Sequence, residues 1–260
     1  MQRIFLTVAT ATAFTIAAAA ALAADMPRPA YKAPPPAPAY FSWTGFYLGV
    51  NFGGGWAHEP HELFNGIPGN SEGGFTHDPR GVIGGGQIGY NWQFAPWFGW
   101  GTGAVLGVEA DFQGSSQTST VNGAFTDPIF GPVTFSGGAE DRLKWFGTVR
   151  GRAGIAFDRV LVYGTGGWAF GNVTLDGTLA SSNAGGPLTA TAFNTSNTMN
   201  GWTAGGGIEW AFLDHWSAKL EYLYIDFGRR DDVAIPAGPF IITNGHFIDN
   251  VARAGVNYKF

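Results

Sequence analysis

The chain has 260 residues, among them 41 glycines, 22 Phe, 10 Trp and 8 Tyr, and only 13% are charged, against about a quarter in an average soluble domain. It contains no cysteine, which excludes a disulfide framework, a thiolate metal site and a cysteine nucleophile. The net charge of −5 argues against nucleic acid as a partner.

The first 23 residues have the features of a secretory signal peptide. Arg3 supplies the positive start, an alanine-rich apolar core follows, and Ala21-Leu22-Ala23 provides small residues at positions −3 and −1 of a cleavage site. An uncleaved membrane anchor is the alternative, but the alanine-rich core and the cleavage motif both count against it. We therefore predict that the protein is exported and cleaved after Ala23.

A proline-rich segment follows, and we assign residues 24–42 to a periplasmic linker. Its stretch "MPRPAYKAPPPAPAY" contains six prolines and has no apolar periodicity. Such a composition favours an extended polyproline II spacer without a core of its own. Residues 43–260 then form the folded domain.

Apolar and polar residues alternate in eight segments of this domain, which is the pattern of a strand with two different faces. In the last segment the apolar set includes Val256, Tyr258 and Phe260, and the polar set includes Arg253 and Asn257. In the fifth segment either set of alternate residues could be the apolar face. The eight predicted strands are residues 46–56, 82–94, 104–113, 142–157, 160–175, 201–212, 216–224 and 251–260.

The connections between these strands alternate in length. Short connections are predicted at 95–103, 158–159 and 214–215, and long ones, rich in Ser, Thr, Asn and Gly, at 57–80, 114–141, 176–200 and 228–246. Tight turns at one end and long loops at the other are typical of bacterial outer-membrane barrels, in which an even number of strands leaves both chain ends in the periplasm.

The distribution of bulky side chains predicts which face meets lipid. An eight-stranded barrel has an interior just wide enough for side chains to fill, so the many large apolar residues of these strands would overfill it. The glycine-rich polar face suits that narrow interior, and closure of the barrel leaves no unpaired strand edge in the hydrocarbon. The sequence therefore predicts an all-β fold: a closed antiparallel eight-stranded transmembrane β-barrel.

Ten charged residues are predicted to face the lumen of this barrel. Buried charges are tolerated when they are paired and hydrogen-bonded, so we interpret the set as an ion-pair network that plugs the barrel. A polar path or gate for small ions is the alternative. The residues are Glu109, Asp111, Lys144, Arg150, Arg152, Glu209, Lys219, Glu221, Arg253 and Lys259.

Four stretches resemble the small outer-membrane β-barrel proteins of Gram-negative bacteria, the porin-family or outer-membrane immunogenic proteins. They are "WTGFYLGVNFGGGW", "FGTVRGRAGIAF", "WSAKLEYLYIDFG" and "AGVNYKF". The resemblance implies a non-enzymatic protein of the outer membrane, with an envelope-structural or porin-like role. Its implied surroundings are outer-membrane lipid and lipopolysaccharide.

The resemblance also implies how the two ends of the mature chain are used. Insertion by the outer-membrane assembly machinery would proceed through the closing strand, with Val256, Tyr258 and Phe260 as its signal. Some barrels of this kind that begin with Ala-Asp are attached covalently to peptidoglycan. Cleavage after Ala23 would give this chain the same start, with Ala24 as the attachment residue.

A histidine-rich stretch supplies the alternative function. "HEPHE" contains His58 and His61, and His77 follows in the same predicted loop. Imidazole is the commonest metal ligand, so a surface site for haem or a metal ion is the second hypothesis. The spacing of three residues with Pro60 between them does not match the zinc-protease pattern. We expect no resident cofactor.

Overall fold

The structure is a computed structural model, and it describes residues 40–64, 71–94, 102–127, 133–182, 189–229, 233–234, 241–243 and 246–260. All of these belong to one compact unit, Tyr40–Phe260. The predicted signal peptide, its cleavage site after Ala23, Ala24 and nearly all of the proline-rich linker lie outside the described residues.

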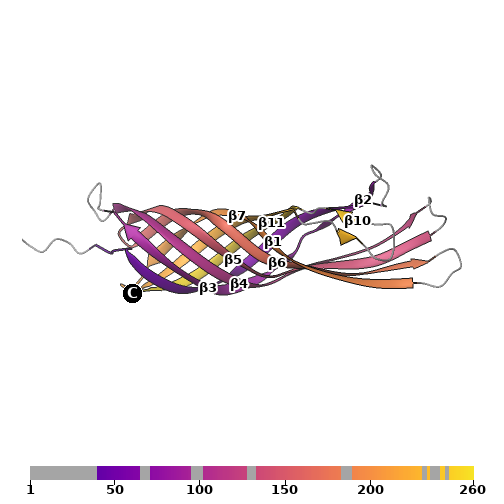
Figure 1. Ribbon diagram of the computed structural model, residues 1–260. Helices are drawn as coiled ribbons and strands as arrows, with labels where there is room; N and C mark the ends of the chain where they lie inside the picture. Colours follow the sequence, from indigo (N-terminus) through magenta and orange to yellow (C-terminus); the bar gives the residue numbers. More distant parts are fainter. Residues whose placement is uncertain are drawn as a thin grey trace, which may run out of the picture. The chain divides into compact units, whose positions relative to one another are not determined.

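Eight long antiparallel strands close into a barrel (Figure 1). Each pairs with the next along the chain, and β11 closes the ring on β1, from Tyr47 opposite Lys259 to His58 opposite Ile248. The closed eight-stranded antiparallel fold predicted from the sequence is confirmed. The ring strands are β1 (Gly45–Phe64), β3 (Arg80–Gln93), β4 (Thr102–Asp127), β5 (Val133–Phe157), β6 (Val160–Ser182), β7 (Thr189–Ala211), β8 (Trp216–Arg229) and β11 (His246–Lys259).

Several strands run much further than the alternation of apolar residues predicted. β4 and β5 extend through most of the expected loop 114–141, and β6 and β7 through most of 176–200. Three short strands, β2 (Ser71–His77), β9 (Val233–Ala234) and β10 (Ile241–Thr243), lie in the other two expected loops and extend the outer part of β1. Outside a bilayer both faces of a strand can meet water. A strand can therefore continue beyond the point at which its alternation of apolar and polar residues stops.

The exterior of the barrel is apolar and its interior carries the polar residues. On β1, Phe46 and Val50 are 61% and 67% exposed, whereas the residue after each of them, Tyr47 and Asn51, is buried. This polarity is the reverse of a water-soluble barrel and agrees with the predicted lipid-facing surface. Among the described residues, no helix is both long and apolar enough to cross a membrane.

The structure shows which side chains face inward on the closing strand and on the fifth strand, whose inner face the sequence left open. On β11 the side chain of Val256 lies outside and that of Arg253 inside, and Phe260, directly after the strand, is exposed, as the alternation predicted. On β6, Leu161, Tyr163 and other odd-numbered residues face the interior.

A β-bulge in the middle of β5 reverses the alternation of its side chains. The register shifts between Leu143 and Trp145, so Lys144 is exposed, and Leu143, expected on the lipid face, is buried inside. Trp145 remains outside, with its ring centroid 5.4 Å from that of Phe112. The bulge inserts one extra residue into the strand, so the inner face consists of odd-numbered residues such as Leu143 before it and of even-numbered residues such as Arg150 after it. The prediction that Lys144 faces the lumen is therefore wrong.

Candidate functional site

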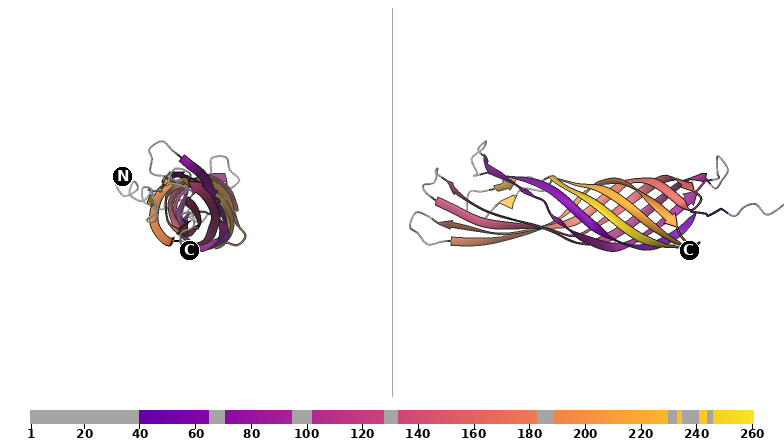
Figure 2. Two further views of the ribbon diagram at one scale, coloured as in Figure 1. Left: turned by 90° about the vertical axis from the view of Figure 1, so that its right-hand side faces the viewer. Right: turned by 180° about the vertical axis from the view of Figure 1, so that it is seen from behind.

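The interior of the barrel is filled by three layers of side chains. We call the end where Gly45 and Lys259 lie the turn end and the opposite end the outer end; Figure 2 shows the barrel from behind and along its axis. A central layer of charged residues lies between two apolar clusters. The turn-end cluster consists of Trp43, Val105, Ala156, Leu161, Tyr163 and Ala211. The outer cluster consists of Ala57, Ile83, Leu143, Phe146, Ala169, Val173, Met199, Leu223, Ile225, Phe227, Phe247 and Val251.

Arg150 is the centre of the charged layer. Its Nη2 donates to Glu109 Oε1 at 2.5 Å and to Asp111 Oδ2 at 2.9 Å, and its Nη1 donates to Glu221 Oε1 at 3.1 Å. Strand register explains part of this arrangement, because Glu109 of β4 lies directly opposite Arg150 of β5. Glu109 and Asp111 are two residues apart and therefore share the inner face.

Three further cations complete the layer. Arg253 Nη2 donates to Glu221 Oε2 at 2.6 Å and Asp111 Oδ2 at 3.0 Å, and Lys219 Nζ donates to Glu109 Oε1 at 3.0 Å. Arg152 Nη2 donates to Glu209 Oε2 at 2.7 Å. Four acids thus meet four bases, and their side chains are only 0–3% exposed. Charges buried to this degree are stable only as a mutually paired set. We call these eight residues the lumen network: Glu109, Asp111, Arg150, Arg152, Glu209, Lys219, Glu221 and Arg253.

Two tyrosines, which were not among the predicted lumen residues, also join the lumen network. Tyr47 Oη donates to Glu109 at 2.7 Å, and Tyr163 Oη donates to Glu221 at 2.9 Å while its ring lies 4.0 Å from the guanidinium carbon of Arg152. Tyr47 lies across Gly89 of the neighbouring strand, where a Cβ would overlap its hydroxyl. Glycine is required there because the ring occupies the space of a side chain. Tyr163 was missed because the inner face of its strand could not be assigned.

Two of the ten predicted lumen charges lie outside the lumen network. Lys144 is exposed because of the β5 bulge. Lys259 lies at the turn end, where its Nζ donates to the carbonyl of Ser42 and lies 4.2 Å from the centroid of the Phe41 ring. Lys259 lies on the inner face of its strand, as the alternation predicts, but the lumen network does not extend as far as the turn end.

The residues before β1 close the turn end. Trp43 is 2% exposed; its Nε1 donates to the carbonyl of Asp158 at 3.0 Å, and its backbone N–H donates to Gln93 Oε1 at 2.7 Å. The backbone N–H of Phe41 donates to Asp158 Oδ1 at 3.0 Å. A hollow lined by Trp43, Tyr47 and Glu209 has a volume of about 10 Å³, at or below the size that holds one water. We call Phe41–Trp43 the turn-end cap.

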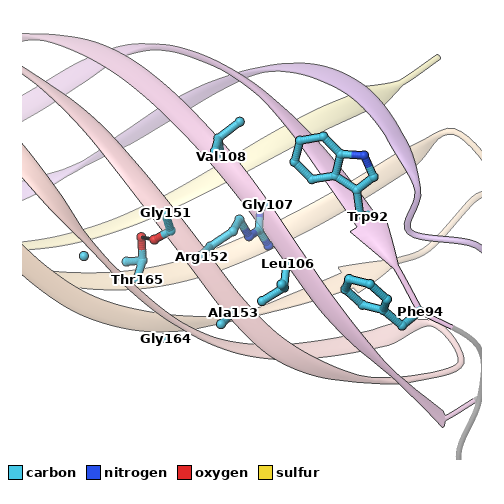
Figure 3. Close-up of a pocket in the computed structure, with 11 residues that line it drawn as sticks. Trp92, Phe94, Leu106, Gly107, Val108, Gly151, Arg152, Ala153, Gly164 and Thr165 are labelled. Carbon is cyan, nitrogen blue, oxygen red and sulfur yellow. Dashed lines mark hydrogen bonds between the residues drawn. The ribbon is translucent and has the colours of Figure 1, made fainter.

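Larger hollows lie on the lipid-facing exterior. One of about 550 Å³ lies across β3 to β6, where Gly151, Ala153 and Gly164 leave a shallow depression beside Trp92 and Leu106 (Figure 3). Another of about 590 Å³ is lined by apolar residues of β1, β7, β8 and β11. Because these walls are almost wholly apolar and face outward, they suit lipid acyl chains.

The histidine site predicted on the first long loop is described only in part. His58 Nδ1 lies 2.7 Å from Asp78 Oδ1, and both side chains are exposed. The backbone register pairs Glu59 with His77 and His61 with Phe75, but the side chains of His61 and His77 lie outside the described part of the chain. No group of three or more metal-ligating side chains occurs among the residues that the structure describes. Capture of haem or a metal by His58, His61 and His77 therefore stays a prediction.

Comparisons with known proteins agree with this architecture. Residues 7–260 match the family model described as outer membrane protein beta-barrel domain. The chain is 39% identical over 248 residues to the 31 kDa outer-membrane immunogenic protein of Brucella melitensis, covering 94% of this chain and 95% of that protein. It is 30% identical to the 22 kDa outer membrane protein of Rhizobium leguminosarum bv. viciae, covering 84% and 79%. Among solved structures, the outer membrane protein OprG of Pseudomonas aeruginosa matches with a TM-score of 0.46 at 9% identity, covering 85% of this chain and 99% of that one.

Proposed function

The chain belongs to the outer-membrane β-barrel family and is an outer-membrane protein, and from this premise we propose that it is a sealed structural barrel attached to the cell wall. In this role it does not conduct ions, it has no enzymatic activity, and it links the outer membrane to peptidoglycan through its N-terminus. Its partners are outer-membrane lipid and lipopolysaccharide, the assembly machinery and the wall.

The filled lumen is the observation that carries this proposal. Eight charges with almost no solvent exposure form one paired set, and an apolar cluster covers each side of it. An ion crossing the barrel would have to displace paired charges and pass through two dry layers, which costs far more than moving through water. These features favour the envelope-structural role over the porin-like one.

Conductance measurements test the seal. We expect the refolded full-length protein to give no steady single-channel conductance in planar bilayers, because no wet path crosses its three interior layers. A water-filled porin inserted into the same bilayers is the positive control. Reproducible open steps from the unmodified protein would contradict the sealed barrel and support the porin-like role.

The position of the chain ends supports attachment to the wall. The backbone N–H of Phe260 donates to the carbonyl of Phe46 at 3.0 Å, so β1 begins and β11 ends at the same end of the barrel. In the outer-membrane architecture that end faces the periplasm. The roughly 17 residues from Ala24 to Tyr40 would reach about 50 Å as polyproline II, which is a plausible distance to the wall.

Chemical analysis of sacculi tests this attachment. After boiling in detergent and digestion with muramidase, we expect N-terminal peptides that begin at Ala24 and carry a peptidoglycan fragment on the amine, detectable by mass spectrometry. An Ala24→Pro variant, which replaces the primary amine with a ring nitrogen, is a suitable control if its cleavage after Ala23 is verified. Recovery of only unmodified Ala24 peptides, all extracted by detergent, would rule out the attachment and leave the sealed barrel untouched.

A further inference from the structure

A four-stranded sheet continues beyond the closed part of the barrel at the outer end. Ladder pairing of β3 with β4 extends outward to Arg80 opposite Thr118, and that of β7 with β8 to Trp202 opposite Asp226. The pairings within β4–β5–β6–β7 continue outward, to Asp127 opposite Val133 and Ser181 opposite Thr189. Figures 1 and 2 show the β4–β5 hairpin and the β6–β7 hairpin projecting together. We call this part the outer sheet.

The outer sheet has two strand edges without a ladder partner among the described strands. One is residues 119–126 of β4, which β2 approaches without pairing, and the other is residues 189–201 of β7. An unpaired edge exposes a row of backbone N–H and C=O groups that can pair with another strand. Many proteins block such edges with charged side chains, proline or bulges.

Neither edge carries these protections. The β4 edge, "STVNGAFT" before Asp127, and the β7 edge, "TATAFNTSNTMNG", contain no charged residue and no proline. Charged residues of the outer sheet lie instead on its two central strands and at the outer tip of β4, at Glu140, Asp141, Arg142, Asp176 and Asp127. This placement is the opposite of a protected edge and leaves both edges compatible with a neighbouring strand.

Two of the central charges, Glu140 and Arg142, are paired with each other within the sheet. Arg142 Nη2 and Nε donate to Glu140 at 2.6 and 2.8 Å, and Thr118 Oγ1 donates to it at 2.9 Å. The hydrogen bonds from Arg142 and Thr118 lower the pKa of Glu140 to about 2, so this carboxylate stays ionised and paired at neutral pH. Glu140 and Arg142 therefore need no external partner.

We propose that the β4 edge of one copy pairs with the β7 edge of the next copy on the cell surface. β4 runs outward and β7 returns inward, so two copies standing in one membrane with the same orientation present these edges antiparallel and at matching heights. Each copy has one edge of each kind, and such head-to-tail contacts extend into rows or rings. The partner is thus a second copy of this chain, joined by backbone hydrogen bonds between the outer sheets.

Cysteine cross-linking tests this contact, and the chain offers a clean background because it has no native cysteine. Thr120 and Asn194 lie on one rung of the sheet, through Glu140 and Asp176. Three strand spacings put them about 14 Å apart within one copy, too far for a disulfide. We expect the Thr120→Cys/Asn194→Cys double variant, oxidised in intact outer membranes, to give a ladder of dimers and larger species on non-reducing gels. Repeating the experiment with Asn122→Cys and Ala192→Cys gives a scan that also covers a small difference in height between the two copies.

A matched control separates edge pairing from random collision. Thr178 is exposed on the central strand β6, so we expect Thr120→Cys/Thr178→Cys to cross-link at least about 10-fold less. Heat-modifiable gel mobility verifies that each variant is folded. Equal cross-linking in the control, links only between like edges, links only to proteins of other masses, or no links across the scan would each overturn the proposal.

Discussion

Replacement of Arg150 by leucine is expected to lower the free energy of unfolding by about 3–5 kcal/mol. The guanidinium donates to Glu109, Asp111 and Glu221, and its side chain is 0% exposed. Leucine fills part of the space but supplies no donor, which leaves four carboxylates with three cations in a nearly dry layer. The midpoint of urea unfolding in lipid vesicles, followed by tryptophan fluorescence, measures the loss.

Arg159→Leu is the matched control for this prediction. Arg159 also forms an ion pair, 2.7 Å from Asp214, but the two side chains are 42% and 80% exposed. Exposed pairs contribute between about 0 and 1 kcal/mol, so the same substitution at Arg159 should shift the midpoint little. Similar midpoints for Arg150→Leu and the unmodified protein would show that water reaches the lumen network and that its ion pairs contribute little.

Removal of Phe260 is expected to reduce the amount of inserted protein in cells by about 10-fold or more while changing the finished barrel little. Phe260 is 71% exposed, and its ring has one aromatic neighbour among the described residues, Tyr258, at 5.2 Å between centroids. Its backbone contributes one hydrogen bond, to Phe46, which amounts to about 0.5–1.5 kcal/mol. The large effect is therefore expected on recognition of the closing strand during assembly. Cell fractionation with heat-modifiable mobility measures insertion, and urea unfolding of refolded protein measures stability.

Phe157→Ala provides the comparison with Phe260→Ala. Phe157 is also an outward aromatic at the turn end, 53% exposed, but it ends β5 rather than the closing strand. If recognition depends on the closing strand, Phe260→Ala should impair insertion and Phe157→Ala should not. Normal insertion of both Phe260 variants, or equal loss from Phe157→Ala, would show that Phe260 acts only as another lipid-facing ring.

Alternation of side chains made the barrel and most of its interior predictable. Within a regular strand, the face of one residue determines the face of every other, so the inward side of Arg253 and the outward side of Val256 follow from the sequence. Glu109, Arg150 and Glu221 could be assigned to the interior for the same reason. The pairing of individual acids with individual bases depends on the register between strands, and this register cannot be read from the sequence.

The failures occurred where alternation is interrupted or absent. The bulge beside Lys144 reversed the inner face of β5, and no residue type there announces an insertion. The sequence predicts loops where the outer sheet lies, because the strands of that sheet meet water on both sides and so need no apolar alternation. Tyr163 stayed unassigned because glycines and apolar residues occupy both faces of its strand, although it donates to Glu221.

The turn-end cap has a mechanical consequence. Any tension on the chain before Tyr40 arrives first at Phe41 and Trp43, whose hydrogen bonds to Asp158 and Gln93 resist it. These contacts join the stressed segment to β3 and to the β5–β6 turn rather than to β1 alone. A pulling force is therefore distributed over several strands of the barrel. The turn-end cap, which covers the lumen, is also the part of the fold that bears a force applied from the periplasm.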